Sequence, residues 1–265
     1  MTVRDFDEFL IGLDPEARGE SSPDGLKWGD LDTEVRAVVT TWMASMNVLR
    51  RAAERKVNLI ITHEPTFWYH GTPVNPELAQ CERDELDIAF KTEFLDAHGM
   101  AVLRAHNNWD TYPEYGIEAC LRDVLGLGEP VERIEKFHGL FEIEPRPLGE
   151  LARGYGRALG LPTVRVAGDL DQPVWRFGLA YGASSGTARY YRLRQAGADA
   201  IVCGEAGEWP AIRPALDMGL GVIELGHQAT EEFGMAGLAR LLRERFPKVP
   251  ITHLPAEPSY HVVRP

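Results

Sequence analysis

The chain has 265 residues, 44% hydrophobic and 26% charged, a composition typical of a globular protein rather than a collagen, a coiled coil or a disordered chain. No apolar run approaches the roughly 20 residues of a membrane-spanning helix, and the acidic N-terminal segment does not resemble a secretory signal. The net charge of −12 disfavours nucleic acids and anionic membranes as partners, and it leaves carboxylates available for hard cations.

The three cysteines are odd in number and widely spaced, at Cys81, Cys120 and Cys203. They form no zinc-ribbon or CxxC pattern. We therefore expect buried thiols in a reducing compartment, and we assign the protein to the cytoplasm.

In chain order, the first half alternates helices with short β-branched strands. We expect a helix at 5–13, a loop at 14–31, a strand at 35–42, a helix at 45–55, a strand at 57–61, a helix at 76–97 and a strand at 101–104. Strands that alternate with helices in this way predict an α/β fold.

The middle and second half continue the alternation without a flexible linker. We expect a strand at 137–143, a turn at 144–147, a helix at 148–159, a strand at 175–181, a helix at 186–196, a strand at 200–203, a helix at 209–218, a strand at 221–225 and a helix at 228–245.

The two halves repeat one another. In each half a strand, a helix and a second strand lead to an acid, Glu64 or Glu205. Further on, an aspartate precedes a strand-end histidine by ten residues, and an acid follows it by four: Asp96, His106 and Asp110, then Asp217, His227 and Glu231. This predicts two pseudo-duplicated α/β halves with mixed sheets, at residues 1–128 and 129–265.

Imidazoles and carboxylates follow the predicted strand ends in both halves. They are His63, Glu64, His106, Asp110, Glu205, His227 and Glu231. Ligands of α/β sheets gather at the carboxyl ends of strands, and residues four apart on a helix share one face, so the set predicts a metal site. The alternative is structural: His227 would cap its helix, Glu231 would be solvated, and His63 would be a loop residue.

Five motifs together resemble the Nif-three-like family of dinuclear-metal proteins, often described as GTP cyclohydrolase type 2-like. They are Asp-Gly-Leu-Lys-Trp-Gly at 24–29, Ile-Ile-Thr-His-Glu-Pro at 60–65, His-Asn-Asn-Trp-Asp at 106–110, Gly-Glu at 204–205, and Gly-His at 226–227 with Glu231. They extend over most of the chain.

The resemblance implies two divalent ions between the halves, and assembly of the chain as a homo-oligomer, commonly a hexameric ring. It assigns one ion to His63, His227 and Glu231, and the other to Glu64, Asp110 and Glu231. The family usually has a second histidine where this chain has Glu64. This carboxylate shifts the expected ions from zinc alone toward Mn, Fe or Mg, and it could also abolish the second site.

Two functions follow as hypotheses. The first is a metal-dependent hydrolase of a small molecule, either a nucleotide, another phosphoester or a cyclic amide, with His106 and Glu205 as catalytic or supporting groups and Arg104 offsetting the acidic charge. The second is a non-catalytic metal-binding or partner-binding ring protein. Three aromatic residues beside the motifs could line a substrate pocket or pack in the core: Trp68, Tyr69 and Trp109.

Overall fold

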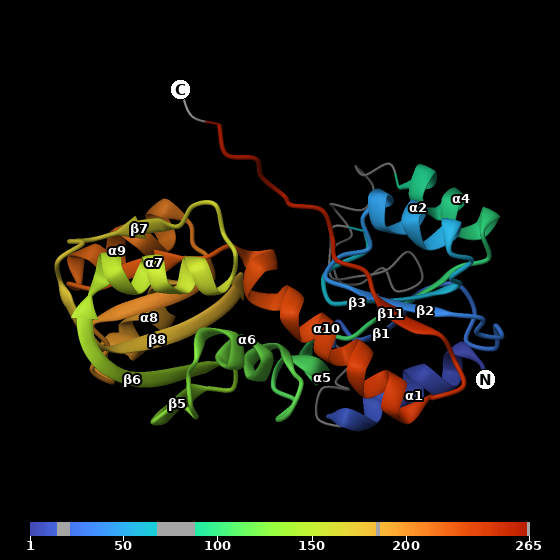
Figure 1. Ribbon diagram of the computed structural model, residues 1–265, viewed down its shortest axis with the longest axis horizontal. Coiled ribbons are helices and arrows are strands. Elements are labelled where there is room, and N and C mark those ends of the chain that lie inside the picture. Colours follow the sequence, from blue (N-terminus) through green and yellow to red (C-terminus); the bar gives the residue numbers. More distant parts are fainter. Residues whose placement is uncertain (15–21, 68–87, 184–185, 264–265) are drawn as a thin grey trace. The chain divides into compact units, whose positions relative to one another are not determined.

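The computed structural model describes residues 1–14, 22–67, 88–183 and 186–263 (Figure 1). It confirms the mixed α/β class, with one mixed sheet in each of two compact units. The first unit comprises Met1–Ile117 and Gly234–Glu257, and the second comprises Glu118–Phe233 and Pro258–Pro265. The expected division into halves at 1–128 and 129–265 refers to the sequence repeat, and it stays a prediction.

The first unit is built on a five-stranded sheet of order β1-β4-β3-β2-β11, in which β1 alone is antiparallel to its neighbour. Its elements are α1 (Val3–Leu13), β1 (Gly25–Trp28), β2 (Val38–Thr41), α2 (Met46–Glu54), β3 (Leu59–Thr62), α4 (Ala89–Ala97), β4 (Ala101–Arg104), α5 (Asn107–Asp110) and β11 (Ile251–His253).

The second unit is built on a six-stranded sheet of order β5-β6-β8-β9-β10-β7. Its elements are α6 (Ile117–Leu125), β5 (Glu132–Glu135), β6 (His138–Pro147), α7 (Leu148–Ala158), β7 (Arg165–Ala167), β8 (Pro173–Ala183), α8 (Thr187–Gln195), β9 (Ala200–Glu205), the π-helix η3 (Glu208–Ile212), α9 (Arg213–Asp217) and β10 (Gly221–Glu224). Helix α10 (His227–Arg245) begins in this unit and continues into the first.

The sheets confirm the predicted repeat. The order β1-β4-β3-β2 of the first sheet corresponds to β7-β10-β9-β8 of the second, and β1 and β7 are the antiparallel edge strands. The chain order is also the same, from α1 or α7 through three parallel strands to a histidine. The strand ends that carry the predicted ligands are therefore equivalent positions in the two units.

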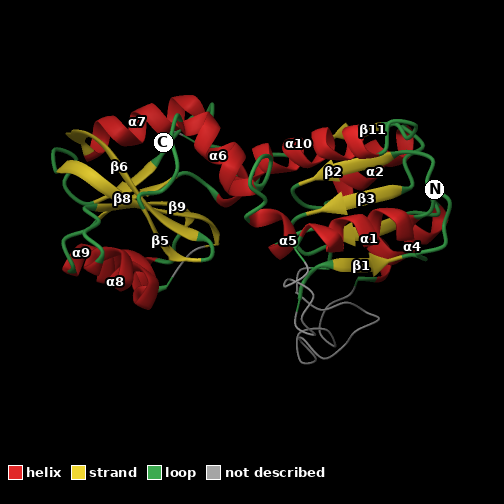
Figure 2. Ribbon diagram, turned by 90° about the horizontal axis from the view of Figure 1, so that it is seen from below, coloured by secondary structure: helices red, strands yellow, loops and turns green. Residues whose placement is uncertain are grey.

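Several strands are almost wholly apolar because helices cover both faces of each sheet. In the first unit α2 and α4 lie on one face, and α1 and the later turns of α10 lie on the other (Figure 1). In the second, α7 lies on one side of the strands, and α8 and α9 lie on the other (Figure 2). Leu59, Ile60 and Ile61 of β3 are accordingly all buried.

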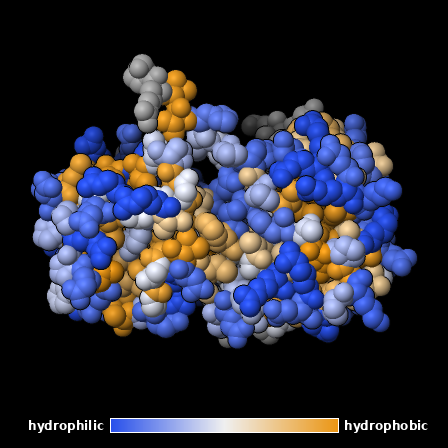
Figure 3. Space-filling model, viewed as in Figure 1, coloured by the Kyte–Doolittle hydropathy of each residue, from blue (hydrophilic) through white to orange (hydrophobic). Residues whose placement is uncertain are grey.

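The visible surface mixes hydrophilic and apolar residues (Figure 3). Hydrophilic residues cover much of the visible face, with apolar residues scattered among them (Figure 3). In the part of the chain that the structure describes, no helix is long and apolar enough to cross a membrane.

The structure corrects three expected elements. The turn expected at 144–147 is instead the end of strand β6, where the pairing with β8 resumes after an irregularity between Glu142 and Arg146. Residues Gly25–Trp28 form β1 inside the expected loop, because their backbone pairs with the edge of β4. The expected helix at 209–218 begins instead as the π-helix η3, before α9. Of the helix expected at 76–97, α4 accounts for Ala89–Ala97, and residues 76–87 lie outside the described part of the chain.

Candidate metal centre

Four candidate ligands of the first unit follow the neighbouring parallel strands β3 and β4. His63 and Glu64 come directly after β3, and His106 follows β4. The last residues of the two strands are paired in register, so the side chains that follow reach the same edge of the sheet. Asp110 ends the single helical turn α5, four residues after His106.

His63, His106 and Asp110 converge on a small volume, since each offers one ligand atom within 4.8 Å of the others. Asp110 Oδ1 lies 3.6 Å from His63 Nε2, and its Oδ2 lies 3.3 Å from His106 Nδ1. The two imidazoles stack with centroids 4.3 Å apart. With metal–ligand distances of about 2.0–2.2 Å, neighbouring ligand atoms of an ion lie about 2.8–3.6 Å apart. The 3.6 Å between His63 Nε2 and Asp110 Oδ1 therefore fits two ligands of one divalent ion.

The orientation of His63 also fits a metal ligand. Its Nδ1 lies 3.0 Å from the carbonyl oxygen of Ala105, which can only accept a hydrogen bond. Nδ1 therefore carries a hydrogen, and in the neutral imidazole the lone pair of Nε2 faces the carboxylate of Asp110. Two electron-rich atoms thus face each other where His63 is 0% exposed and Asp110 is 4% exposed. A cation between them relieves this arrangement.

Arg104 supports this edge of the sheet from below. It is 1% exposed, and its Nε donates to the backbone oxygen of His63 at 2.7 Å. Its Nη2 lies 3.9 Å from Glu64 Oε2, and Glu64 Oε1 lies 3.5 Å from His106 Nε2. Arg104 therefore neutralises charge inside the cluster. The expectation that it attracts an anionic substrate from solvent is wrong, because it is too buried.

Asp24 holds the turn that carries Asp110. Its carboxylate accepts hydrogen bonds from the backbone N–H groups of His106 and Asn108. Next to it, Lys27 is 7% exposed and donates to the backbone oxygen of Asp24 at 3.0 Å. Burial and the Arg104 guanidinium lower the pKa of Lys27 to about 8. Sequence reasoning assigned no role to Asp24, although it begins one of the family motifs.

In the second unit, His227 lies between two carboxylates. Its Nε2 is 3.0 Å from Glu231 Oε2, one turn later in α10, and its Nδ1 is 3.4 Å from Glu205 Oε1, at the end of β9. Glu231 is buried, whereas the side chain of Glu205 is 51% exposed. A histidine whose second nitrogen faces a carboxylate is held in one orientation, which is usual for a metal ligand.

A glycine at an irregularity of β8 makes room for the Glu231 carboxylate. The register of β8 against β9 shifts between Ala180 and Ala183, and Gly182 there has φ +67°. A Cβ atom on Gly182 would overlap Glu231 Oε1. The backbone N–H of Gly182 also donates to Thr230 Oγ1 at 3.1 Å, which anchors the first turn of α10.

Within each unit, the predicted site residues come together. The first unit brings together His63, Glu64, His106 and Asp110, and the second brings together Glu205, His227 and Glu231. His106, expected to be a proton carrier, lies inside the first group of potential ligands.

The aromatic and cysteine residues singled out in the sequence do not join the candidate metal ligands in the part of the chain that the structure describes. Trp109 is buried and its Nε1 donates to the Gly234 oxygen at 2.9 Å, so it packs in the core. Cys203 is also buried, and burial raises the pKa of its thiol to about 12. Trp68, Tyr69 and Cys81 lie outside the described residues.

Named proteins are similar in sequence to this chain over most of its length. A protein of Pseudomonas aeruginosa named GTP cyclohydrolase 1 type 2 homolog is 28% identical over 221 residues, which are 80% of this chain and 81% of that protein. A Clostridium acetobutylicum protein of the same name is 25% identical over 216 residues, 78% of this chain and 76% of that protein.

Solved structures share the whole fold. The protein ybgI, described as of unknown function, superposes with a TM-score of 0.79 at 25% identity, over 98% of this chain and 100% of that one. TTHA1606 from Thermus thermophilus gives a TM-score of 0.73 at 26% identity, over the same shares. The model of the Duf34/NIF3 (NGG1p interacting factor 3) family matches residues 1–259, so the chain belongs to that family.

Proposed function

We propose that this chain binds two divalent metal ions through His63, Glu64, Asp110, His227 and Glu231. The observation that carries the proposal is the pairing, after equivalent strands of both units, of an imidazole with a carboxylate: His63 Nε2 lies 3.6 Å from Asp110 Oδ1, and His227 Nε2 lies 3.0 Å from Glu231 Oε2. Imidazole and carboxylate ligands suit Mn, Fe and Zn, and the carboxylate of Glu64 in place of a histidine extends the range toward Mg.

We further propose that the protein is a hydrolase of a small molecule, either a nucleotide, another phosphoester or a cyclic amide. Two bound ions would polarise the substrate and lower the pKa of a water molecule that acts as nucleophile. The names of the Pseudomonas and Clostridium relatives support this reaction class.

Two residues would support the chemistry. His106 contacts both Glu64 and Asp110, and its side chain is 23% exposed, so it can exchange a proton with solvent while touching the cluster. Glu205 would accept a hydrogen bond from His227 Nδ1 and keep the opposite nitrogen directed at Glu231. We therefore assign His106 to proton transfer and Glu205 to positioning.

Metal content per chain tests the binding proposal. We expect elemental analysis of metal-replete protein to find about two divalent ions in the wild type and a loss in His227→Ala. His261→Ala, which removes an exposed histidine outside the cluster, should keep the wild-type content. Failure to bind metal, or full occupancy in His227→Ala, would overturn the proposal. If two ions bind, phosphoesters and cyclic amides are the substrates to screen.

One observation favours a second candidate, a metal-binding protein without catalysis. Glu64 already lies beside Arg104 and His106, so the protein itself can balance its charge without a second ion. In that case the wild type should hold about one ion and Glu64→His about two. Such a result would assign the chain to metal binding or to a partner-binding ring, and the two-metal hydrolase would be abandoned.

We also propose that the chain is a cytoplasmic homo-oligomer, assembled as a hexameric ring. Light scattering coupled to gel filtration should then give a mass near six times the 29.6 kDa of one chain. A monomer at micromolar concentration would contradict this assembly.

A further inference from the structure

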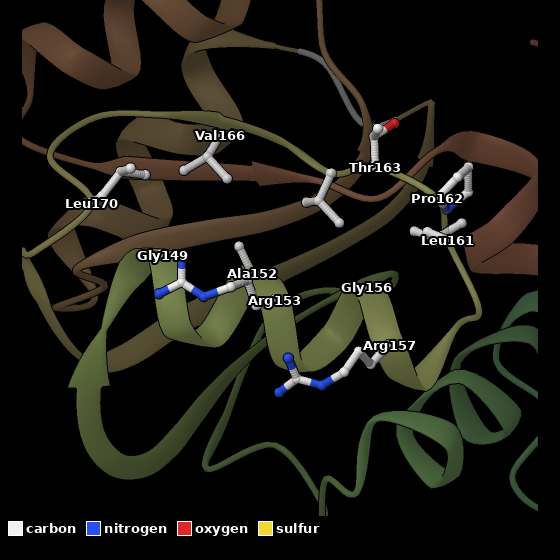
Figure 4. A pocket seen from close by; sticks show the side chains of 11 residues that line it. Gly149, Ala152, Arg153, Gly156, Arg157, Leu161, Pro162, Thr163, Val166 and Leu170 are labelled. Carbon is white, nitrogen blue, oxygen red and sulfur yellow. The ribbon is translucent and has the colours of Figure 1, made fainter. Parts of the chain in front are cut away.

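A cavity lies in the second unit, between helix α7 and the chain segment that follows it. The segment 161–170 turns back along the helix and borders an open cavity of about 510 Å³ (Figure 4). This volume is in the range of small-molecule sites, about 300–1,000 Å³. None of the candidate metal ligands lines it.

Hydrogen bonds fix this segment against the helix at both ends. The N–H of Leu161 donates to the Gly156 oxygen at 2.8 Å, and the N–H of Gly149 donates to the Leu170 oxygen at 2.9 Å. The cavity between these two attachment points is therefore a preformed feature of the fold, and a ligand would meet it without prior ordering of a loop.

Two glycines of α7 let the segment approach the helix at these ends. A Cβ on Gly156 would lie 2.5 Å from Val164 Cγ2, and one on Gly149 would lie 3.2 Å from Leu170 Cβ. The two glycines are seven residues apart, or about 10.5 Å along the helix. Between them the small side chain of Ala152 leaves room at an apolar floor, and Leu170, which is 51% exposed, adds apolar surface to the wall.

Arg153 and Arg157 supply two positive charges to this cavity. They are four residues apart on α7, both line the cavity, and both are exposed (Figure 4). Neither guanidinium forms an ion pair or a side-chain hydrogen bond within the described ranges of the chain, and Glu150, one turn before Arg153, does not pair with it. Like charges at this spacing repel one another, so the pair is best satisfied by an external anion.

We propose that this cavity binds a small organic phosphate, in which a phosphomonoester is attached to a compact apolar group. A phosphomonoester carries close to two negative charges at neutral pH, which match two guanidinium groups, whereas a carboxylate matches one. Arginine also binds phosphate oxygens through two parallel hydrogen bonds. The apolar group would occupy the floor beside Ala152 and the wall formed by Leu170.

Phenyl phosphate is a suitable probe, because it combines both parts of the proposed ligand. We expect isothermal titration calorimetry or ligand-observed NMR to detect phenyl phosphate binding to the full chain. The affinity for inorganic phosphate and for benzoate should each be at least tenfold lower than for phenyl phosphate. Arg153→Glu and Arg157→Glu should each weaken phenyl phosphate about tenfold or more. Arg213→Glu, which changes an exposed arginine outside the cavity, should bind like the wild type.

Leu170→Ser tests the apolar part separately, and it should weaken phenyl phosphate but leave inorganic phosphate unchanged. Equal binding by Arg153→Glu, Arg157→Glu and the wild type would overturn the proposal, and so would the absence of phenyl phosphate binding. Binding only to vesicles that contain phosphatidic acid would also overturn it, because the arginines would then serve a lipid surface. Metal-free protein gives the same test, so failure here is independent of the metal proposal.

Discussion

The substitution Gly182→Ala tests the packing of Glu231 directly. Gly182 has φ +67°, and a Cβ atom there would overlap the Glu231 carboxylate. The chain offers a matched control in Gly160, which has the same φ of +67° but no atom within 4 Å of an added Cβ. Both substitutions impose the same backbone strain, and only the first displaces a proposed metal ligand.

The two free energies should differ for this reason. Alanine in the left-handed conformation is about 1–2 kcal/mol less favourable than glycine, partly offset because alanine restricts the unfolded chain. We therefore expect Gly160→Ala to lower the free energy of unfolding by about 1 kcal/mol. Overpacking adds about 1–3 kcal/mol, so Gly182→Ala should lower it by about 2–4 kcal/mol.

Urea denaturation of the metal-free proteins measures these differences, and a double-mutant cycle identifies their origin. In the background of Glu231→Ala the carboxylate is gone, so Gly182→Ala should be no more harmful than Gly160→Ala. Metal affinity should fall about tenfold or more in Gly182→Ala and stay unchanged in Gly160→Ala. Equal losses in the two glycine variants, or a cycle without coupling, would refute the proposed packing of Glu231 against Gly182.

Three further predictions concern the first unit. Asp24→Ala removes the acceptor for two backbone N–H groups of the ligand-bearing turn, so the free energy of unfolding should fall by about 1–3 kcal/mol, and metal affinity should fall with it; an unchanged metal affinity would contradict the positioning role. Lys27 binds its proton less tightly in the folded chain than in the unfolded chain, because its pKa is about 8 in the folded chain and 10.5 otherwise. The free energy of unfolding of the wild type, relative to that of Lys27→Met, should therefore rise by about 3 kcal/mol between pH 8 and pH 10.5. A difference between the two proteins that does not change with pH in urea denaturation would contradict this. Trp109→Phe leaves the Gly234 oxygen without its indole donor, and calorimetry should show a loss of about 1–2 kcal/mol with unchanged metal content.

The central strands were predictable because burial on both faces produces short apolar runs, as in β3 and β4, whereas helix α6 and the strands β5, β7 and β11 were not expected. Elements that depend on other signals were not. The four residues of β1 include a glycine, and they form a strand because the backbone of β4 presents an open edge. The π-helix η3 has no periodicity over five residues that distinguishes it from an α-helix.

The candidate ligands were predictable from their position after strands and from the repeat. Asp24 was not, because its partners lie 82 and 84 residues later in the chain. The spacing of residues also could not show that Arg104 points inward, since an arginine at the end of a strand can equally face solvent.

The repeat gives a physical reason for Glu64. In the second unit Glu205 lies beside one nitrogen of His227 and Glu231 beside the other. In the first unit Glu64 and Asp110 flank His106 in the same way, with the nitrogens exchanged. A carboxylate after β3 therefore makes the first group chemically equivalent to the second, whereas a histidine there would pair two imidazoles. On this reasoning Glu64→Gln should loosen the orientation of His106 as Glu205→Gln loosens that of His227, and crystal structures of the two variants should show the affected imidazole turned away or in two orientations. An unmoved His106 ring in Glu64→Gln would contradict the equivalence of the two groups.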